Sequence, residues 1–286
     1  MGKFHKAGPD EPRYLIIPAA GLGTRMRVVN PDLPKELLPV GHKPAIQYAV
    51  DEGVSAGINN IIIIISRQKE IIRQYFEESS RVKKLFPAFS EEIIQTNEKC
   101  SFTFFYQKEL SGEADAISYA GDIAAGHSVA IIYPDDIYFP APGALAFLKS
   151  FKSYGPDIFG LINVSPDNAA CYSNSGRVDV IPVKDPIYKI KRFHKKEEGN
   201  FTLRFKKELR TCGISIFGPH LFENIEKARA TVREGEFTDG PVIESILMER
   251  DISGCRLPGT IYDIGNPAGY RICIEHNAKK GSIIEQ

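Results

Sequence analysis

The sequence predicts an α/β fold built on a doubly wound, mostly parallel sheet, followed by a mixed second half. Three observations indicate it. Apolar runs of strand length alternate with helical patterns through the first half of the chain. The run NIIIII at 60–65 is apolar on both faces, which is typical of a strand covered by helices on both sides. A glycine-rich loop directly follows the first apolar run. Strands separated by helices form right-handed βαβ units, and such units build a doubly wound sheet.

The first half alternates regularly. We expect its strands at 14–18, 60–65, 102–107 and 128–134. We expect its helices at 44–57, 67–78 and 113–124. The first of these helices has the clearest limits, because it begins at Pro44 and ends at Gly57. Prolines at 31, 34 and 39 argue against a helix directly after the glycine-rich loop.

The second half is less regular. Strands are predicted at 157–164 and 212–218. A helix is predicted to begin at Thr238 or Asp239, because either residue can cap a helix that continues into an apolar periodic stretch. Residues 171–210 are rich in charge, glycine and proline, which indicates hairpins or an inserted lobe.

Length and composition suit one continuous domain. The chain has 286 residues, of which 43% are hydrophobic and 25% charged. No linker is evident, so we expect a flexible tail over 1–12 and a single domain over 13–286. Lys+Arg and Asp+Glu both number 36, so the formal net charge is zero. Without a basic excess, nucleic acid is not an expected partner.

The cysteines and the hydropathy favour a cytoplasmic protein. The five cysteines are scattered and form no C-x-x-C pair, which predicts reduced thiols and no zinc site. The first residues are polar and lack the apolar segment of a signal peptide. No apolar run approaches the length of a membrane span, so we expect no membrane contact.

The loop in LIIPAAGLGTRM, residues 15–26, is the strongest functional signal. Gly21 and Gly23 let backbone N–H groups approach a phosphate. A dinucleotide-binding loop would need a third glycine where Met26 stands and a helix right after it, and a Walker A loop would need Gly-Lys-Ser/Thr. Arg25 and Lys35 add two cations, which suit a polyphosphate. The alternative is a surface turn with solvated charges.

Polar residues at other expected strand ends could complete a site. Asp135 and Asp136 follow a strand, at the edge of an α/β sheet where ligands bind. Asp263 lies far along the chain, in YDIGNPAGY. Gln107 also ends a strand, and its amide can donate and accept a hydrogen bond at once. Each residue has a simpler interpretation, as turn chemistry for the aspartates and a solvated strand end for Gln107.

These motifs together resemble a known family. PAAGLGTRM followed by PKELLPVGHKPAIQYAVDEGVSAGI resembles the sugar-1-phosphate nucleotidyltransferases, and among them the bacterial UTP–glucose-1-phosphate uridylyltransferases, or UDP-glucose pyrophosphorylases. The resemblance extends more thinly from about residue 13 to about residue 275. It implies a Rossmann-like sheet of the nucleotidyltransferase type. It also implies a nucleotide-binding half over 13–135 and a sugar-phosphate-binding half over 136–286.

The resemblance also implies roles for single residues. Arg25 and Lys35 would be catalytic, and Asp135 and Asp263 would hold Mg²⁺. Two aspartates suit this ion, which prefers few carboxylates together with phosphate oxygens and water. The nucleotide would be bound by Ala20, Gly21, Gly23, Thr24, Gln107 and Gly112.

The sugar-phosphate motif departs from the family. Where the family has Glu-Lys-Pro, the string KIKRFHKKEEG places Lys196 at the phosphate-binding lysine and Lys195 at the glutamate that holds sugar hydroxyls. Lys195 cannot accept those hydrogen bonds. A shift by one residue would make Lys195 the phosphate ligand, and a solvated basic hairpin tip is a further alternative. Gly176 and Gly213 match positions where the family backbone closes on the sugar.

The implied reaction is uridylyl transfer from UTP to glucose 1-phosphate, giving UDP-glucose and pyrophosphate. The family further implies a homo-oligomer. The altered Glu-Lys-Pro region keeps a dTTP-dependent enzyme, or one for another sugar 1-phosphate, open as an alternative. A non-catalytic nucleotide-sugar sensor is an alternative of a different class.

Overall fold

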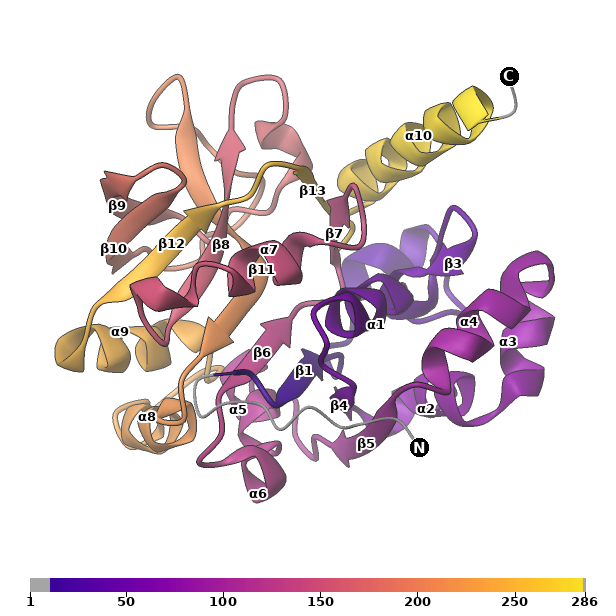
Figure 1. Cartoon of the computed structure of the whole chain (residues 1–286), viewed down its shortest axis with the longest axis horizontal. Coiled ribbons are helices and arrows are strands. Elements are labelled where there is room, and N and C mark those ends of the chain that lie inside the picture. The colour runs from indigo at the N-terminus through magenta and orange to yellow at the C-terminus, as the bar shows by residue number, and fades with distance from the viewer. Residues whose placement is uncertain (1–10, 285–286) are drawn as a thin grey trace.

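The computed structural model describes residues 11–284 (Figure 1). The flexible tail expected over residues 1–12 lies largely outside the described residues. Of that segment, Glu11 is described, and its carboxylate forms ion pairs with Lys149 and Lys152 at the end of α7 (Ala144–Lys149) and just beyond it. No described helix is both long and apolar enough to cross a membrane. All five cysteines have free thiols.

A nine-stranded sheet runs through both halves of the chain, in the order β5-β4-β1-β6-β11-β8-β12-β10-β9. Neighbouring strands β5, β4, β1 and β6 are all parallel, as expected for the first half. Seven of the nine strands run in one direction and only β11 and β10 are reversed, so the sheet is mostly parallel. The strands of this sheet are β1 (Tyr14–Pro18), β4 (Asn60–Ile65), β5 (Ser101–Tyr106), β6 (Val129–Ile132), β8 (Ile158–Val164), β9 (Val178–Lys184), β10 (Ile187–Phe193), β11 (Glu208–Phe217) and β12 (Ile252–Arg256).

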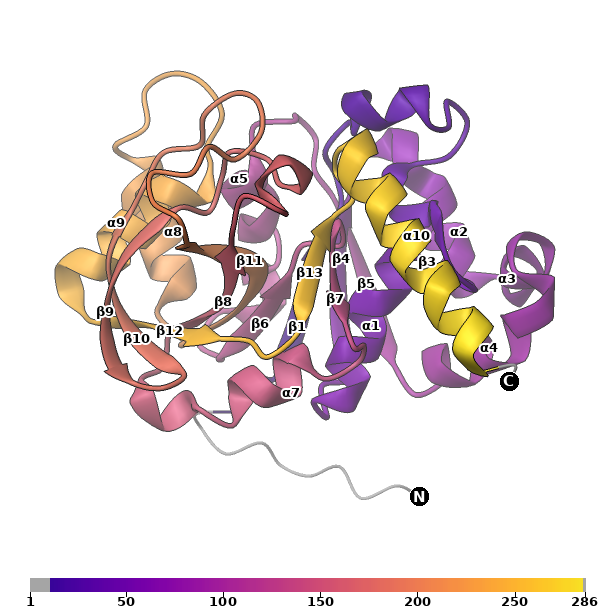
Figure 2. The same cartoon turned by 90° about the horizontal axis from the view of Figure 1, so that it is seen from above.

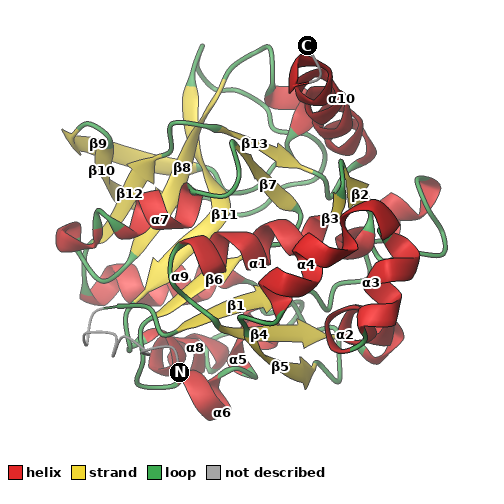
Figure 3. Cartoon of the chain, turned by 45° about the vertical axis from the view of Figure 1, so that its right-hand side comes forward, coloured by secondary structure: helices red, strands yellow, loops and turns green. Residues whose placement is uncertain are grey.

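Helices cover both faces of the sheet, and each face has its own hydrophobic core (Figure 3). One face carries α1 (Ala45–Ser55), α2 (Glu70–Glu77), α3 (Ser79–Leu85), α4 (Ser90–Asn97) and α7. The other face carries α5 (Glu113–Ser118), α6 (Gly121–Ala124), α8 (Leu221–Arg229) and α9 (Asp239–Glu249). This arrangement confirms the doubly wound fold.

The central strands show why the pattern predicts this fold. Along β4, Ile61 and Ile63 lie in one core, whereas Ile62 and Ile64 lie in the other. Successive side chains of a strand point to opposite faces, so a run of isoleucine is favourable only where both faces are buried. The expected helix at 67–78 forms as a 3-10 turn, Arg67–Lys69, followed by α2.

The segment 171–210, for which the sequence left two readings, contains a hairpin. Strands β9 and β10 pair antiparallel at one edge of the large sheet, and the chain returns to the sheet centre in β11. The strand predicted at 212–218 is in fact longer, because β11 begins at Glu208. The first residues of β11 include two buried charged side chains, Glu208 and Arg210, so a search for apolar strand residues does not identify them.

A short ribbon connects distant parts of the chain. Strands β7 (Asp136–Phe139) and β13 (Thr260–Asp263) pair antiparallel and lie between the large sheet and α10 (Pro267–Ile284) (Figure 2). Their register places Asp263 opposite Asp136. The sequence did not predict this ribbon, nor α3, α4, α7, α8 and β12. A second small ribbon consists of β2 (Pro39–Val40) and β3 (Lys43–Pro44).

Candidate active site

A cavity of about 620 Å³ opens where residues of both halves of the chain meet. Its walls come from the glycine-rich loop, the end of β6, the β7–β13 ribbon, the β9–β10 hairpin, β11 and the start of α9. The predicted site residues that line it are Arg25, Asp135, Gly176, Lys195, Lys196, Gly213 and Asp263. The fold thus brings Arg25 together with the predicted metal-binding and sugar-phosphate-binding residues, whereas Lys35 and the predicted nucleotide-binding residues do not line this cavity.

The glycine-rich loop leaves β1 without forming an α-helix. Gly23 has φ +60°, a backbone conformation that favours glycine, and a 3-10 turn, Thr24–Val28, follows it. Gly23 packs against the stem of Lys35, since a methyl group placed on it would lie 3.4 Å from the lysine Cγ. Ala20 is buried in the core, whereas Gly21 and Thr24 are exposed. The loop also encloses a second cavity of about 140 Å³.

Lys35 and Asp135 form an ion pair at the floor of the site. The lysine Nζ lies 2.5 Å from Asp135 Oδ2. Burial alone would lower the pKa of Lys35, but the carboxylates of Asp135 and Glu36 outweigh burial and raise it. Burial would likewise raise the pKa of Asp135, whereas Lys35 brings it below its usual range. Both groups are therefore charged at neutral pH.

A buried lysine joins the two ends of the loop. Lys69 Nζ donates to the carbonyl of Ala19 at 3.0 Å and to both carboxylate oxygens of Glu36 at 2.8 Å. Lys69 is 5% exposed and Glu36 is 1% exposed. Ala19 precedes the glycines and Glu36 directly follows Lys35, so this contact limits where Lys35 can lie.

Three aspartates share the floor. Asp263 accepts hydrogen bonds from the backbone N–H and the hydroxyl of Ser173 through Oδ2, and from the N–H of Gly265 through Oδ1. A methyl group on Gly265 would lie 2.7 Å from Asp135 Oδ2 and 3.0 Å from Asp263 Oδ1. The two carboxylates therefore border the same small space. Burial raises the pKa of Asp136 to about 8, and the two neighbouring carboxylates add to that effect against the opposing charge of Arg210.

The donor set fits Mg²⁺. Two carboxylates facing one space match an ion that binds few carboxylates and fills its other positions with phosphate oxygens and water. No cluster of three or more His, Cys, Asp or Glu side chains suited to a metal occurs in the described part of the chain.

Gln107 and Gly112 lie together, and neither residue lines the large cavity. Gln107 is 4% exposed, and its Nε2 donates to the carbonyl of Gly112 at 3.0 Å and to Asp115 Oδ2 at 2.8 Å. Asp115 in turn forms an ion pair with Arg229 at 2.8 Å. Gly112 has φ +112°, and a Cβ there would overlap the carbonyl of Phe237. This glycine is therefore explained by packing alone, and its role in binding a base stays a prediction.

The sugar-phosphate side of the cavity holds the other predicted residues. Gly176 and Gly213 both have positive φ, +72° and +67°. A Cβ on Gly176 would lie 2.6 Å from Thr211 Oγ1, and one on Gly213 would overlap the Asp136 carboxylate. Lys195 and Lys196 are exposed beyond the end of β10, and both line the cavity. The register between these two lysines stays open.

Several lining residues were missed by the sequence analysis. The most notable are Glu113, Tyr133, Arg210, Thr238 and Asp239. Thr238 and Asp239 carried a signal, since the start of a helix was predicted there, but a helix start by itself does not indicate a site. Burial raises the pKa of Asp239 to about 7, and the charge of Glu113 adds to this effect. Arg210 carried no local signal.

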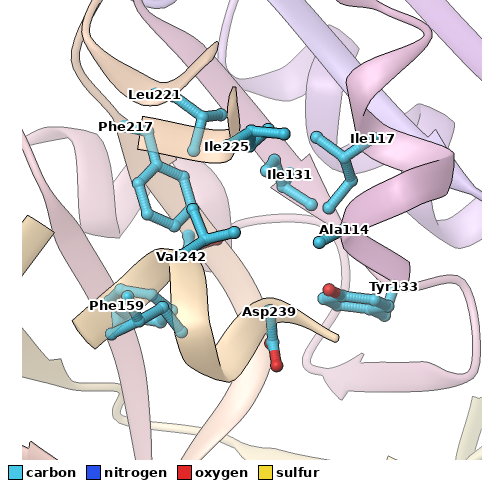
Figure 4. Close-up of a pocket in the computed structure, with 12 residues that line it drawn as sticks. Ala114, Ile117, Ile131, Tyr133, Phe159, Phe217, Leu221, Ile225, Asp239 and Val242 are labelled. Carbon is cyan, nitrogen blue, oxygen red and sulfur yellow. The ribbon is translucent and has the colours of Figure 1, made fainter. Parts of the chain in front are cut away.

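A small apolar cavity of about 30 Å³ adjoins the site (Figure 4). Side chains from α5, β6, β11, α8 and α9 surround it, among them Ile117, Phe217 and Val242. Tyr133, Asp239 and Ile243 line both cavities. These three residues lie between the polar site and the core.

Comparison with known proteins identifies the family. The family model described as nucleotidyl transferase matches residues 14–278. A UTP–glucose-1-phosphate uridylyltransferase of Staphylococcus saprophyticus is 29% identical over 261 residues, covering 89% of this chain and 88% of the relative. The UTP–glucose-1-phosphate uridylyltransferase of Bacillus subtilis strain 168 is 28% identical over 264 residues, covering 90% and 88%.

Solved structures agree. A crystal structure of UDP-glucose pyrophosphorylase in complex with UDP-glucose superimposes with a TM-score of 0.77 and 25% sequence identity. The match covers 94% of this chain and 100% of that one. The mostly parallel sheet, the cavity at its strand ends and the match over nearly the whole chain lead to one assignment. The chain belongs to the nucleotidyl transferase family.

Proposed function

We propose that this nucleotidyltransferase transfers the uridylyl group of UTP to glucose 1-phosphate, forming UDP-glucose and pyrophosphate. The names of its relatives support this substrate pair. The observation that carries the proposal is the shared cavity. Loop residue Arg25, the paired carboxylates Asp135 and Asp263, and the hairpin lysines Lys195 and Lys196 border one space, which matches two phosphate-bearing substrates that must meet.

The chemistry needs charge stabilisation more than proton transfer. The phosphate of glucose 1-phosphate is already a nucleophile, so its oxygen can attack the α-phosphorus of UTP in line while pyrophosphate leaves. A general base is not required. The residues must therefore hold two anions together and stabilise the charge that develops at phosphorus and on the leaving group.

The loop cations divide this work. Arg25 is exposed at the cavity and forms no ion pair with any described residue, so its guanidinium is available for the pyrophosphate portion of UTP. Lys35 is held at the floor beside Asp135 and would keep the phosphates aligned. Backbone N–H groups around Gly21 and Gly23 would approach the phosphates closely.

Mg²⁺ belongs to the same proposal. Asp135 and Asp263 would hold the ion, since their carboxylates border one space. When bound, it would draw negative charge from the phosphate oxygens. Ser173 and Gly265 orient Asp263 through three hydrogen bonds, so the chain itself fixes the direction of that carboxylate.

The base and the sugar would be read from opposite sides. We assign residues 13–135 to nucleotide binding, with Gln107 and Gly112 near the base, and residues 136–286 to the sugar phosphate, with Gly176, Gly213, Lys195 and Lys196. The two halves share one sheet and would act as a single domain. We further propose a cytoplasmic enzyme that works as a homo-oligomer.

The test is pyrophosphate release with Mg²⁺ over a grid of nucleoside triphosphates and sugar 1-phosphates. We expect turnover with UTP and glucose 1-phosphate well above all other pairs. Turnover that prefers dTTP or another sugar would keep the proposed chemistry and overturn the proposed specificity. The other substrates are included because Lys195 stands where the family has a glutamate that holds sugar hydroxyls. Nucleotide binding without turnover of any pair would support a sensor instead.

A further inference from the structure

Arg210 is a buried cation in the wall of the large cavity. It lies on β11 and is 3% exposed. Its Nε donates to the carbonyl of Ser175 at 3.3 Å, and a methyl group on Gly176 would lie 3.5 Å from the same atom. Ser175 and Gly176 both line the cavity, as does Arg210 itself. The guanidinium of Arg210 therefore lies in the wall on the sugar-phosphate side of the cavity.

The hydrogen-bonding capacity of Arg210 is largely unused. Nη1 is buried and has no hydrogen-bond partner within the described residues. No described carboxylate lies within ion-pair distance of the guanidinium, although its positive charge lowers the pKa of the nearby Asp136 against the effect of burial. An arginine carries five N–H donors, and burying a charge without a partner is strongly unfavourable.

The neighbouring arginine shows the contrast. Arg177 and Arg210 face each other in an antiparallel bridge, so the two side chains start from nearly the same place. Arg177 donates to both carboxylate oxygens of Glu208, at 2.8 and 2.9 Å, and also to the carbonyl of Thr202. The protein thus neutralises one arginine of this pair and leaves the other without an anion.

The position of Arg210 is nonetheless well defined. Its guanidinium lies over the ring of Tyr172, 4.7 Å from the centroid, and the Tyr172 hydroxyl donates to the carbonyl of Ile261 at 2.9 Å. Stacking on an aromatic ring favours one orientation of the planar group. A held, unpaired guanidinium beside a cavity is preorganised for an anion that arrives from outside.

We propose that Arg210 binds the phosphate group of the sugar 1-phosphate. The inference rests on the proposed transferase function, which supplies this anion. Arg210 contacts the segment that contains Gly176, on the sugar-phosphate side, whereas the triphosphate has its own cations, Arg25 and Lys35, on the loop. An arginine fork contacts two phosphate oxygens in one fixed plane, whereas Lys195 and Lys196 are exposed and each offers a point charge without that directionality.

The experiment compares wild-type protein with Arg210→Met and Arg210→Lys. Calorimetry measures binding of glucose 1-phosphate, and steady-state kinetics measures the KM for each substrate. We expect Arg210→Met to weaken glucose 1-phosphate binding and to raise its KM roughly 10-fold to 100-fold, as for loss of a charged hydrogen bond. The KM for UTP should stay unchanged, and Arg210→Lys should fall between the two. Thermal unfolding establishes that each variant is folded.

Arg192→Met is the matched control, because Arg192 is an exposed arginine on the hairpin strand β10 and does not line the cavity. It should behave as wild type. Wild-type affinity for glucose 1-phosphate in both Arg210 variants would overturn the inference, as would a raised KM for UTP alone. Binding that is lost in Arg210→Met, in a protein without turnover, would overturn only the proposed function. A wild-type protein that does not bind glucose 1-phosphate would overturn the inference itself.

Discussion

Arg25 and Lys35 come from one loop but differ in their surroundings. Lys35 is held by the Asp135 carboxylate and its pKa is raised, so it stays protonated throughout the neutral range. Arg25 is exposed and forms no ion pair with the described residues. A cation already paired in the free protein changes less on substrate binding than one that is unpaired. Arg25 should therefore respond more directly to the charge that develops on the leaving pyrophosphate.

Arg25→Ala should lower kcat/KM for UTP by about 10²-fold to 10³-fold, the usual effect of removing one donor to developing charge. Arg27→Ala is the matched control, because Arg27 lies on the same 3-10 turn and is exposed, and it lines the smaller loop cavity, not the large one. The measurement is the initial rate of pyrophosphate release. Equal rates for the two variants would show that the loop charge at position 25 has no part in the reaction.

Gly112 illustrates a residue whose type is set by packing. It has φ +112°, and a side chain would overlap the carbonyl of Phe237. We expect Gly112→Ala to lower the free energy of unfolding by about 2–4 kcal/mol, from backbone strain plus the clash. Gly126→Ala separates the two causes, since Gly126 has φ +78° but no atom within 4 Å of the added methyl group. Gly126→Ala should lower the free energy of unfolding by about 1–2 kcal/mol, as measured by urea unfolding.

At the scale of elements, the glycine-rich loop is held in place by a lysine from the turn that precedes α2. Lys69 lies in the 3-10 turn between β4 and α2, and it donates hydrogen bonds to the carbonyl of Ala19 and to the carboxylate of Glu36. Lys69 and Glu36 are both buried, so water cannot solvate either charge. The contact ties the start and the end of the glycine-rich loop to the helical layer.

Lys69→Met should destabilise the fold by about 3–5 kcal/mol, because it leaves the Glu36 carboxylate buried without a partner. Lys69→Met combined with Glu36→Leu removes both charges and should recover most of that loss. Urea unfolding of the two single variants and the double variant measures the coupling. Additive losses in the double variant would contradict a buried ion pair.

The hairpin is held to β11 by charges. Burial would raise the pKa of the Glu208 carboxyl, but hydrogen bonds from Arg204 and Arg177 outweigh it and lower the pKa below the ordinary 4.5. A carboxyl whose pKa is lower in the folded state stabilises the protein above the unfolded pKa. That contribution is lost as the pH falls below about 4.5 and through the lower folded pKa.

Glu208→Gln should therefore reduce the loss of stability that wild type shows on acidification from pH 6 to pH 3. The measurement is the urea midpoint at several pH values for both proteins. Glu98→Gln serves as a comparison, because Glu98 is an exposed residue beyond α4 for which no ion pair is seen in the described structure. An identical pH dependence of wild type and Glu208→Gln would mean that this network contributes nothing to acid sensitivity.

At the scale of the whole molecule, the metal-binding proposal depends on the β7–β13 ribbon. Asp135 precedes β7 and Asp263 ends β13, and the register of the ribbon brings these distant segments together. Gly265 leaves the space between the two carboxylates open. The site is thus complete only when the last strand of the chain has joined the middle of it.

Asp263→Asn should raise the Mg²⁺ concentration that gives half-maximal activity. It should also lower the maximal rate roughly 10-fold to 100-fold, the scale seen when one metal contact is removed. A Mg²⁺ titration of pyrophosphate release measures both quantities. Asp251→Asn is the control, since Asp251 is exposed and forms its ion pair with Lys189 at the surface. Unchanged Mg²⁺ dependence in Asp263→Asn would remove Asp263 from the proposed metal site.

Local patterns in the sequence are sufficient to predict the layers of the fold and the loop that marks the site. The isoleucine run of β4 is stable only between two apolar layers, and prolines after Met26 prevent an α-helix. Both signals are contained in neighbouring residues. The order of motifs along the whole chain indicates the family.

The tertiary structure decided which distant side chains meet. Asp263 lies beside Asp135 because two short strands pair, Gln107 donates its amide to Asp115, and Arg210 lies unpaired in the cavity wall. No local period encodes these contacts, because the partner of each charge comes from another part of the chain. Whether a buried charge is neutralised by the protein or left for a ligand depends on that partner, and only the folded arrangement supplies it.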